Sequence, residues 1–93
     1  MGRIAAAIER KLTEAFAPTR LAVIDDSHRH AGHAGARPEG ETHFRVELVA
    51  ASFAGQSRVA RQRLVYAALA DELRTHVHAL QLTTLAPDED VAD

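Results

Sequence analysis

Apolar residues recur at every fourth position near the start of the chain, and charged residues stand between them. The series consists of Ile4, Ile8, Leu12 and Phe16. Side chains three or four residues apart lie on one face of an α-helix. Pro18 ends the pattern, because a residue that precedes a proline disfavours the helical conformation. The pattern predicts an amphipathic helix over residues 3–16.

Three shorter segments have the character of β-strands. Residues 21–25 form an apolar run between turn signals, and residues 80–85 form another that ends before Pro87. Residues 42–49 alternate between apolar and polar side chains, which is typical of a half-buried strand. The apolar face of that strand contains Phe44, Val46 and Leu48.

Residues 58–74, between the second and third strands, have a helical pattern. Ser57 is a candidate N-cap, since its hydroxyl can accept a backbone N–H of the first turn. The predicted inner stripe of this helix contains Val59, Tyr66, Leu69 and Leu73, widened by Val65 and Ala70. We expect the helix to break into two pieces near residues 61–63.

The order of these elements restricts the topology. Two strands joined by a loop without a helix pair antiparallel, whereas a helical crossover favours a parallel, right-handed connection. The sequence therefore predicts one α+β domain over residues 1–93, with a core of about residues 3–87. Its three-stranded mixed sheet should be covered by helices on one face.

Composition narrows the classes of function. The chain has no cysteine, which excludes disulfides and any thiolate metal site made by this chain alone. Its net charge of −2 with neutral histidines is not that of a generally basic nucleic-acid binder. No apolar stretch approaches the roughly 20 residues of a membrane span, and the first residues do not resemble a signal peptide. We expect a cytoplasmic protein without membrane contact, and a frayed acidic tail over residues 88–93.

A polar loop of about fifteen residues joins the first two strands, a length that is often functional. It contains His28, His30 and His33. In a chain without cysteine, imidazoles are the only soft metal ligands, so a bound metal must rest on histidine or on ligands from a partner. A solvated polar loop explains the same residues, and the loop lacks a fourth ligand for structural zinc.

The sequence gives little support for an enzyme. It has no cysteine nucleophile, and none of its serines stands in an activating motif. Asp25 and Asp26 are neighbours at a strand end, where their side chains diverge. For His43, in the second strand, we expect a structural hydrogen bond rather than catalysis.

Several segments, taken in order, resemble the BolA-like family. They are Asp25-Asp26-Ser27, Glu41-Thr42-His43-Phe44-Arg45-Val46, Phe53-Ala54-Gly55, Arg61-Gln62-Arg63-Leu64-Val65-Tyr66, Leu69-Ala70-Asp71-Glu72-Leu73 and Val77-His78-Ala79-Leu80. The resemblance covers about residues 3–89, and it implies an α-β-β-α-α-β fold similar to the class II KH domain. The chain departs from the family pattern at Gln62, where a histidine is usual, and lacks a tryptophan after Glu89.

The resemblance implies an adaptor that binds a monothiol glutaredoxin and shares a [2Fe-2S] cluster with it, for iron–sulfur trafficking or iron sensing. In such a complex the glutaredoxin cysteine and a glutathione thiolate supply sulfur, and the BolA-like protein supplies imidazole. The implied ligands are His78, before the last strand, and His30 from the loop, with His33 as the alternative to His30. Without the resemblance, the preferred interpretation of His78 is a half-buried structural histidine at a strand start, and the resemblance reverses that preference in favour of a cluster ligand.

The resemblance also implies a second function, that of a DNA-binding transcriptional regulator. Arg58, Arg61 and Arg63 form the only basic cluster, and the first two share a helix face. This face is either solvated or contacts DNA, a glutathione carboxylate or a partner surface. A few phosphate contacts would give weak, salt-sensitive binding. Whether the free protein is a monomer or a homodimer stays open.

Overall fold

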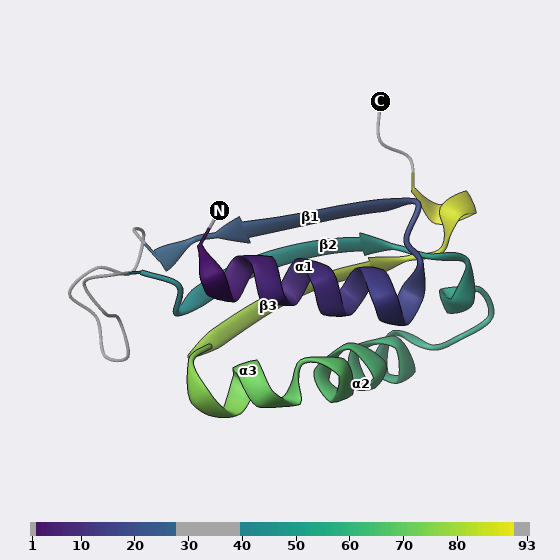
Figure 1. The fold of residues 1–93 in the computed structure, drawn as a ribbon. Coiled ribbons are helices and arrows are strands. Elements are labelled where there is room, and N and C mark those ends of the chain that lie inside the picture. The colour runs from purple at the N-terminus through teal and green to yellow at the C-terminus, as the bar shows by residue number, and fades with distance from the viewer. Residues whose placement is uncertain (1, 28–39, 91–93) are drawn as a thin grey trace.

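The computed structural model describes residues 2–27 and 40–90 of the chain. Within these residues the α+β architecture expected from the sequence is confirmed (Figure 1). The elements are α1 (Arg3–Phe16), β1 (Arg20–Asp25), β2 (His43–Val49), the 3₁₀ helix η2 (Ala51–Phe53), α2 (Arg58–Ala68), α3 (Ala70–Thr75), β3 (Ala79–Leu85) and the 3₁₀ helix η3 (Pro87–Glu89). None of the helices in the described residues is long and apolar enough to cross a membrane.

The three strands form the mixed sheet that the sequence predicts. Strand β2 lies in the middle, antiparallel to β1 and parallel to β3. In this register Phe44 lies opposite Asp25, and His43 lies opposite Ala79. The end of β1 and the starts of β2 and β3 therefore meet at one end of the sheet.

The core lies between the sheet and the helices, which cover one of its faces (Figure 1). The stripe predicted for the first helix is observed, since Ile8 and Leu12 are fully buried and Ile4 nearly so. The buried residues of β2 that meet it are Phe44, Val46 and Leu48. Helix and strand thus bury the faces that their periodicities predict.

The second helical segment differs from the sequence prediction in two respects. Ser57 caps α2 as expected, because its Oγ accepts the Ala60 N–H at 3.1 Å. The break, however, falls at Leu69 (φ −106°, ψ 19°) and not near residues 61–63. Leu69 is only 1% exposed, so anchoring of this side chain in the core fixes the bend without a glycine or proline. The predicted inner stripe is wrong at Val59 and Tyr66, which are 55% and 41% exposed, and at Ala70, which is also exposed.

The acidic tail is ordered further than predicted. Glu89 is the last residue of η3, and its carboxylate forms an ion pair with Arg61. Asp90 accepts hydrogen bonds from the Arg20 guanidinium at 3.0 and 3.1 Å. The expectation of a frayed tail is therefore wrong for residues 88–90. Residues 91–93 lie outside the described part of the chain.

Candidate functional site

His78 immediately precedes β3, at the end of the sheet where the three strands meet. Its backbone N–H donates to the Thr42 carbonyl at 2.7 Å, and the Ala79 N–H donates to the same oxygen at 3.1 Å. These bonds continue the parallel pairing of β2 and β3 by one residue. They fix the backbone of His78 beside Thr42, while the His78 residue itself is exposed.

A second histidine lies against His78. The ring centroids of His43 and His78 are 5.3 Å apart, and the rings are inclined by 53°. His43 is only 6% exposed, and its Nδ1 lies 2.9 Å from the Thr42 hydroxyl. The structural hydrogen bond expected for His43 is thus present, and the ring also packs against His78, which the sequence did not indicate.

The segment Asp25-Asp26-Ser27 holds the connection between β1 and β2 at its base. The Asp25 carboxylate accepts the Ser27 N–H at 3.0 Å, the Ser27 hydroxyl, and the Glu41 N–H at 3.1 Å. Ser27 Oγ in turn accepts the N–H groups of Thr42 at 3.0 Å and His43 at 3.2 Å. Both ends of the connection are therefore bound to each other, directly beside the backbone that holds His78.

Glu41 attaches the start of α1 to the same end of the sheet. Gly40 (φ 76°) and Glu41 (φ 62°) both adopt left-handed backbone conformations that turn the chain into β2. The Glu41 carboxylate accepts the Ala5 N–H at 2.9 Å, so a negative charge lies at the N-terminus of the helix, where the helix dipole favours it. A Cβ at Gly2, the helix N-cap, would approach this carboxylate to 2.2 Å, so a larger residue there would require the Glu41 side chain to move.

The loop histidines His28, His30 and His33 lie outside the described residues. Their assignment as metal ligands stays a prediction. Among the residues that the structure describes, no three His, Asp or Glu side chains are grouped so as to hold a metal ion. At this end of the sheet the described residues include His78, which is exposed, His43, which is buried against it, and His76, which is partly exposed.

The three arginines singled out in the sequence do not form one exposed cluster. Arg58 and Arg63 are exposed, but Arg61 is only 8% exposed. The Arg61 guanidinium donates to the carbonyl of Gln56 at 2.9 Å, to that of Thr84 at 3.2 Å, and to both carboxylate oxygens of Glu89 at 2.7 and 3.2 Å. The expectation that Arg61 shares an exposed face with Arg58 is therefore corrected, because Arg61 joins α2 to β3 and η3.

Comparison with known proteins gives the chain a family. A family model described as BolA-like protein matches residues 12–89. A Sinorhizobium sp protein encoded in the cobS 5′ region is 51% identical over 83 residues, which cover 88% of this chain and 89% of that protein. The DNA-binding transcriptional regulator BolA of Escherichia coli is 48% identical over 77 residues, which cover 83% of this chain and 70% of the regulator.

The fold is also similar to solved structures. The BolA domain of SufE1 from Arabidopsis thaliana superposes with a TM-score of 0.86 at 40% identity, over 96% of this chain and 98% of that domain. The match spans 23% of the curated SufE-like protein 1 and 54% of chloroplastic BOLA1 from the same plant, so those relatives are longer proteins. Sequence and fold agree, and the chain belongs to the BolA-like family.

Proposed function

We propose that this protein is an adaptor for iron–sulfur trafficking or iron sensing. It binds a monothiol glutaredoxin and completes a [2Fe-2S] cluster with it. His78 is one ligand of this chain, and His30, or His33 in its place, is the other. The glutaredoxin cysteine and a glutathione thiolate supply the sulfur ligands.

The observation that carries the proposal is the position of His78. It is exposed, and its backbone N–H is bound to Thr42, two residues after Gly40. The connection that contains His30 and His33 ends at that point. The segments that carry the proposed ligands are therefore distant in the sequence but attached to the fold at one place. A group that is shared with another protein also requires an exposed ligand, which His78 is and the buried His43 is not.

The donors of this chain fit such a shared site. The chain has no cysteine, so it cannot supply thiolates. The ligands that it can contribute to such a cluster are the imidazole nitrogens of its histidines. Replacing thiolates by neutral imidazoles removes negative charge from the site and raises its reduction potential. An imidazole must be deprotonated at the ligating nitrogen, so association should weaken as the pH falls.

The surrounding residues hold the ligand rather than react. The carbonyl of Thr42 fixes the backbone of His78, and the ring of His43 supports its imidazole from the side of the protein. Asp25 and Ser27 hold both ends of the loop that carries the second ligand. In the proposed complex this chain therefore holds His78 in place and anchors both ends of the loop, while the partner brings the metal.

The test mixes the protein anaerobically with cluster-loaded monothiol glutaredoxin and records visible absorption and circular dichroism. We expect His78→Ala to lose the spectrum of the mixed complex, and one of His30→Ala and His33→Ala to lose it as well. His76→Ala is the matched control, because His76 lies two residues away and its Nδ1 is already bound to the Thr75 hydroxyl at 2.9 Å. Identical spectra for His78→Ala and wild type would rule out the ligand assignment.

A second candidate function is DNA binding, which the names of relatives support. Regulators from Escherichia coli and Vibrio cholerae, 48% and 45% identical, are both called DNA-binding transcriptional regulator BolA. In this chain Arg58 and Arg63 are exposed at α2, so they are the arginines of the predicted cluster that could reach phosphate. Titrating duplex DNA at two salt concentrations tests this function, since phosphate contacts give affinity that falls with salt. Absence of binding at low salt would exclude it.

A further inference from the structure

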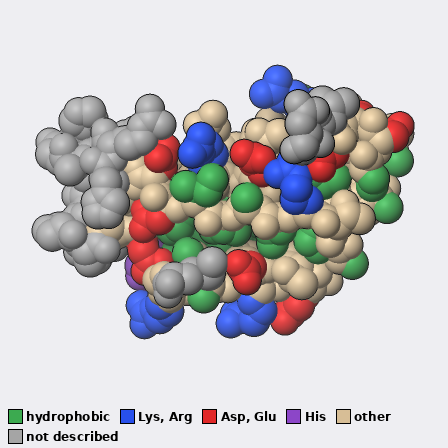
Figure 2. Space-filling view, turned by 90° about the horizontal axis from the view of Figure 1, so that it is seen from above, with side chains coloured by type: hydrophobic (Ala, Val, Ile, Leu, Met, Phe, Trp, Pro, Cys, Tyr) green, Lys and Arg blue, Asp and Glu red, His purple; other side chains and the backbone are tan. Residues whose placement is uncertain are grey.

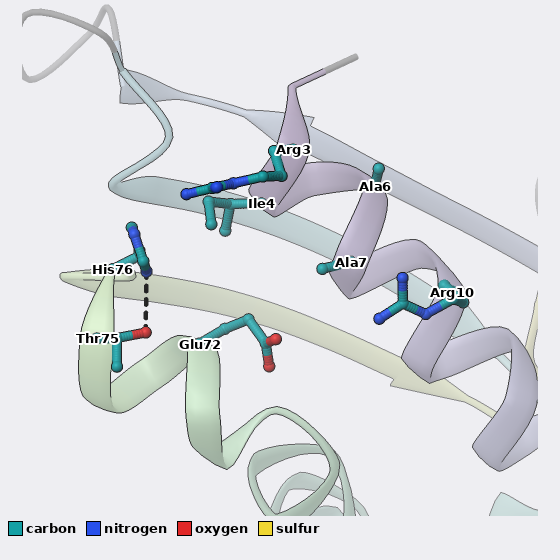
Figure 3. Close-up of a pocket in the computed structure, with 8 residues that line it drawn as sticks. All are labelled: Arg3, Ile4, Ala6, Ala7, Arg10, Glu72, Thr75 and His76. Atoms are coloured by element: carbon teal, nitrogen blue, oxygen red, sulfur yellow. Dashed lines mark hydrogen bonds between the residues drawn. The ribbon is translucent and has the colours of Figure 1, made fainter.

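A groove of about 420 Å³ lies between α1 and α3, beside the end of the sheet that carries His78 (Figure 3). Helix α1 contributes Arg3 and Arg10 to it, with Ile4, Ala6 and Ala7 between them. The other wall includes Glu72 and His76. The short side chains of the alanines leave this space open between the two helices.

Two arginines line this groove, on a chain whose net charge is −2 and whose acidic and basic side chains are interspersed over the face shown in Figure 2. Arg3 and Arg10 are exposed, and neither forms an ion pair with any residue of the described part of the chain. Glu72, the one acidic residue in the lining, has its carboxylate 2.7 Å from Lys11 Nζ. That pairing neutralises Glu72 within the fold, so the two arginines set the charge of the groove.

The arrangement of the arginines indicates the shape of a ligand. They are seven residues apart in a helix, which separates their backbones by about 10 Å along the axis. Figure 3 shows Arg3 reaching from α1 toward His76, and Arg10 directed toward Glu72, so both guanidinium groups overhang the groove. In these directions the two guanidinium groups match an extended peptide, which covers this length in about three residues, better than a single compact anion.

We propose that this groove binds an acidic, extended segment of a partner protein. Two carboxylate side chains, two or four positions apart and therefore on one face of that extended segment, pair with Arg3 and Arg10. A small apolar residue between them lies on Ile4, Ala6 and Ala7. The interaction requires neither a cluster nor His78, so it stands or falls independently of the function proposed above.

The probe is a fluorescein-labelled peptide that contains Glu-Thr-Ala-Thr-Glu, in which both glutamates and the alanine lie on one face of an extended chain. Its binding to the full chain is measured by fluorescence anisotropy. We expect saturable binding at low salt that weakens as salt is added, and none for the matched peptide with Gln-Thr-Ala-Thr-Gln. Arg3→Gln and Arg10→Gln should each weaken binding by about threefold, and the double variant should weaken it by about tenfold. Arg63→Gln, which removes an exposed arginine from α2, is the control for net charge and should bind as wild type does.

A steric variant separates the groove from general electrostatics. Ala6→Leu fills the space between the arginines without changing the charge. Ala6 is exposed, and leucine like alanine favours the helical conformation, so the fold should tolerate the change. We expect it to prevent peptide binding while thermal unfolding stays that of wild type. Binding of the acidic peptide that is equal in wild type, the double arginine variant and Ala6→Leu would overturn the proposal. Absence of binding to wild type at low salt, or competition by inorganic phosphate beyond its ionic strength, would overturn it too.

Discussion

The ring of His43 supports the ring of His78, with 5.3 Å between the centroids and an inclination of 53°. The first ring is buried and bound to Thr42, whereas the residue that it supports is exposed. Replacing a residue that orients a metal ligand without touching the metal typically lowers metal affinity by about 10- to 100-fold. The ring of His43 therefore covers one side of the His78 ring, so that a metal can reach the proposed ligand only from the other side.

Replacement of His43 should weaken the shared cluster without removing a ligand. His43→Ala deletes the supporting ring, and we expect the mixed complex with glutaredoxin to retain its cluster about tenfold less well against a chelator. His43→Phe keeps a ring of similar breadth but loses the bond to Thr42, so it should lie between His43→Ala and wild type. Far-ultraviolet circular dichroism checks that both variants are folded. Equal retention by all three proteins would show that the ring contact has no influence on the site.

Ser27 should be a major contributor to the stability of this end of the sheet. Its Oγ accepts two backbone N–H groups and donates to Asp25, and the residue is 5% exposed. Ser27→Ala leaves buried donors without an acceptor, which costs about 1–3 kcal/mol of the free energy of unfolding. Ser52→Ala is the matched control, because Ser52 is exposed and only its carbonyl is hydrogen-bonded in the described residues. Urea unfolding measures both, and equal midpoints would contradict the role given to Ser27.

Folding stability should decline in acid because of Glu89. Hydrogen bonds from Arg61, and then from the Ala86 N–H, hold the pKa of Glu89 below its ordinary value of 4.5. The pKa is lower in the folded state, so the stabilisation is fully present above the unfolded value and is lost as the pH falls through the folded one. We expect the free energy of unfolding of the wild type to decrease as the pH is lowered below about 4.5.

The variant Glu89→Gln tests this pH dependence. It should be less stable than wild type at pH 7, because the buried guanidinium of Arg61 loses its counter-ion, and its stability should change less between pH 5 and 3. Glu9→Gln removes an exposed carboxylate of α1 and serves as the matched control. Urea unfolding across this pH range distinguishes the two variants. Superimposable profiles would show that the Arg61–Glu89 contact does not produce the acid sensitivity.

Local patterns predicted most of the fold because each is produced by neighbours in the chain. The four-residue spacing of Ile4, Ile8 and Leu12 gave the bounds of α1, and the alternation around Val46 gave β2 to within one residue. The hydroxyl of Ser57 identified the start of α2 for the same reason. These signals need no knowledge of distant contacts.

The errors lie where distant contacts decide. Arg61 resembles an exposed helix residue in the sequence, but Glu89, 28 positions later, provides its counter-ion. The contact of His43 with His78 likewise depends on the parallel register that places His43 opposite Ala79. A pattern read along one segment contains neither piece of information. The resemblance to the BolA-like family supplied His78 as a candidate, but not the ring beside it.

Val59 in α2 and Leu69 in the turn after it allow a direct comparison of an exposed and a buried position. Val59 and Leu69 were both predicted to be inside, yet Val59 is 55% exposed and Leu69 is 1% exposed. Leu69→Ala removes a side chain from the close-packed core at the bend between α2 and α3, and should cost about 2–5 kcal/mol of the free energy of unfolding. Val59→Ala removes a surface side chain and should change stability by no more than about 0.5 kcal/mol. Urea unfolding of the two variants under one condition measures the difference, and a comparable loss in both would place Val59 in the core after all.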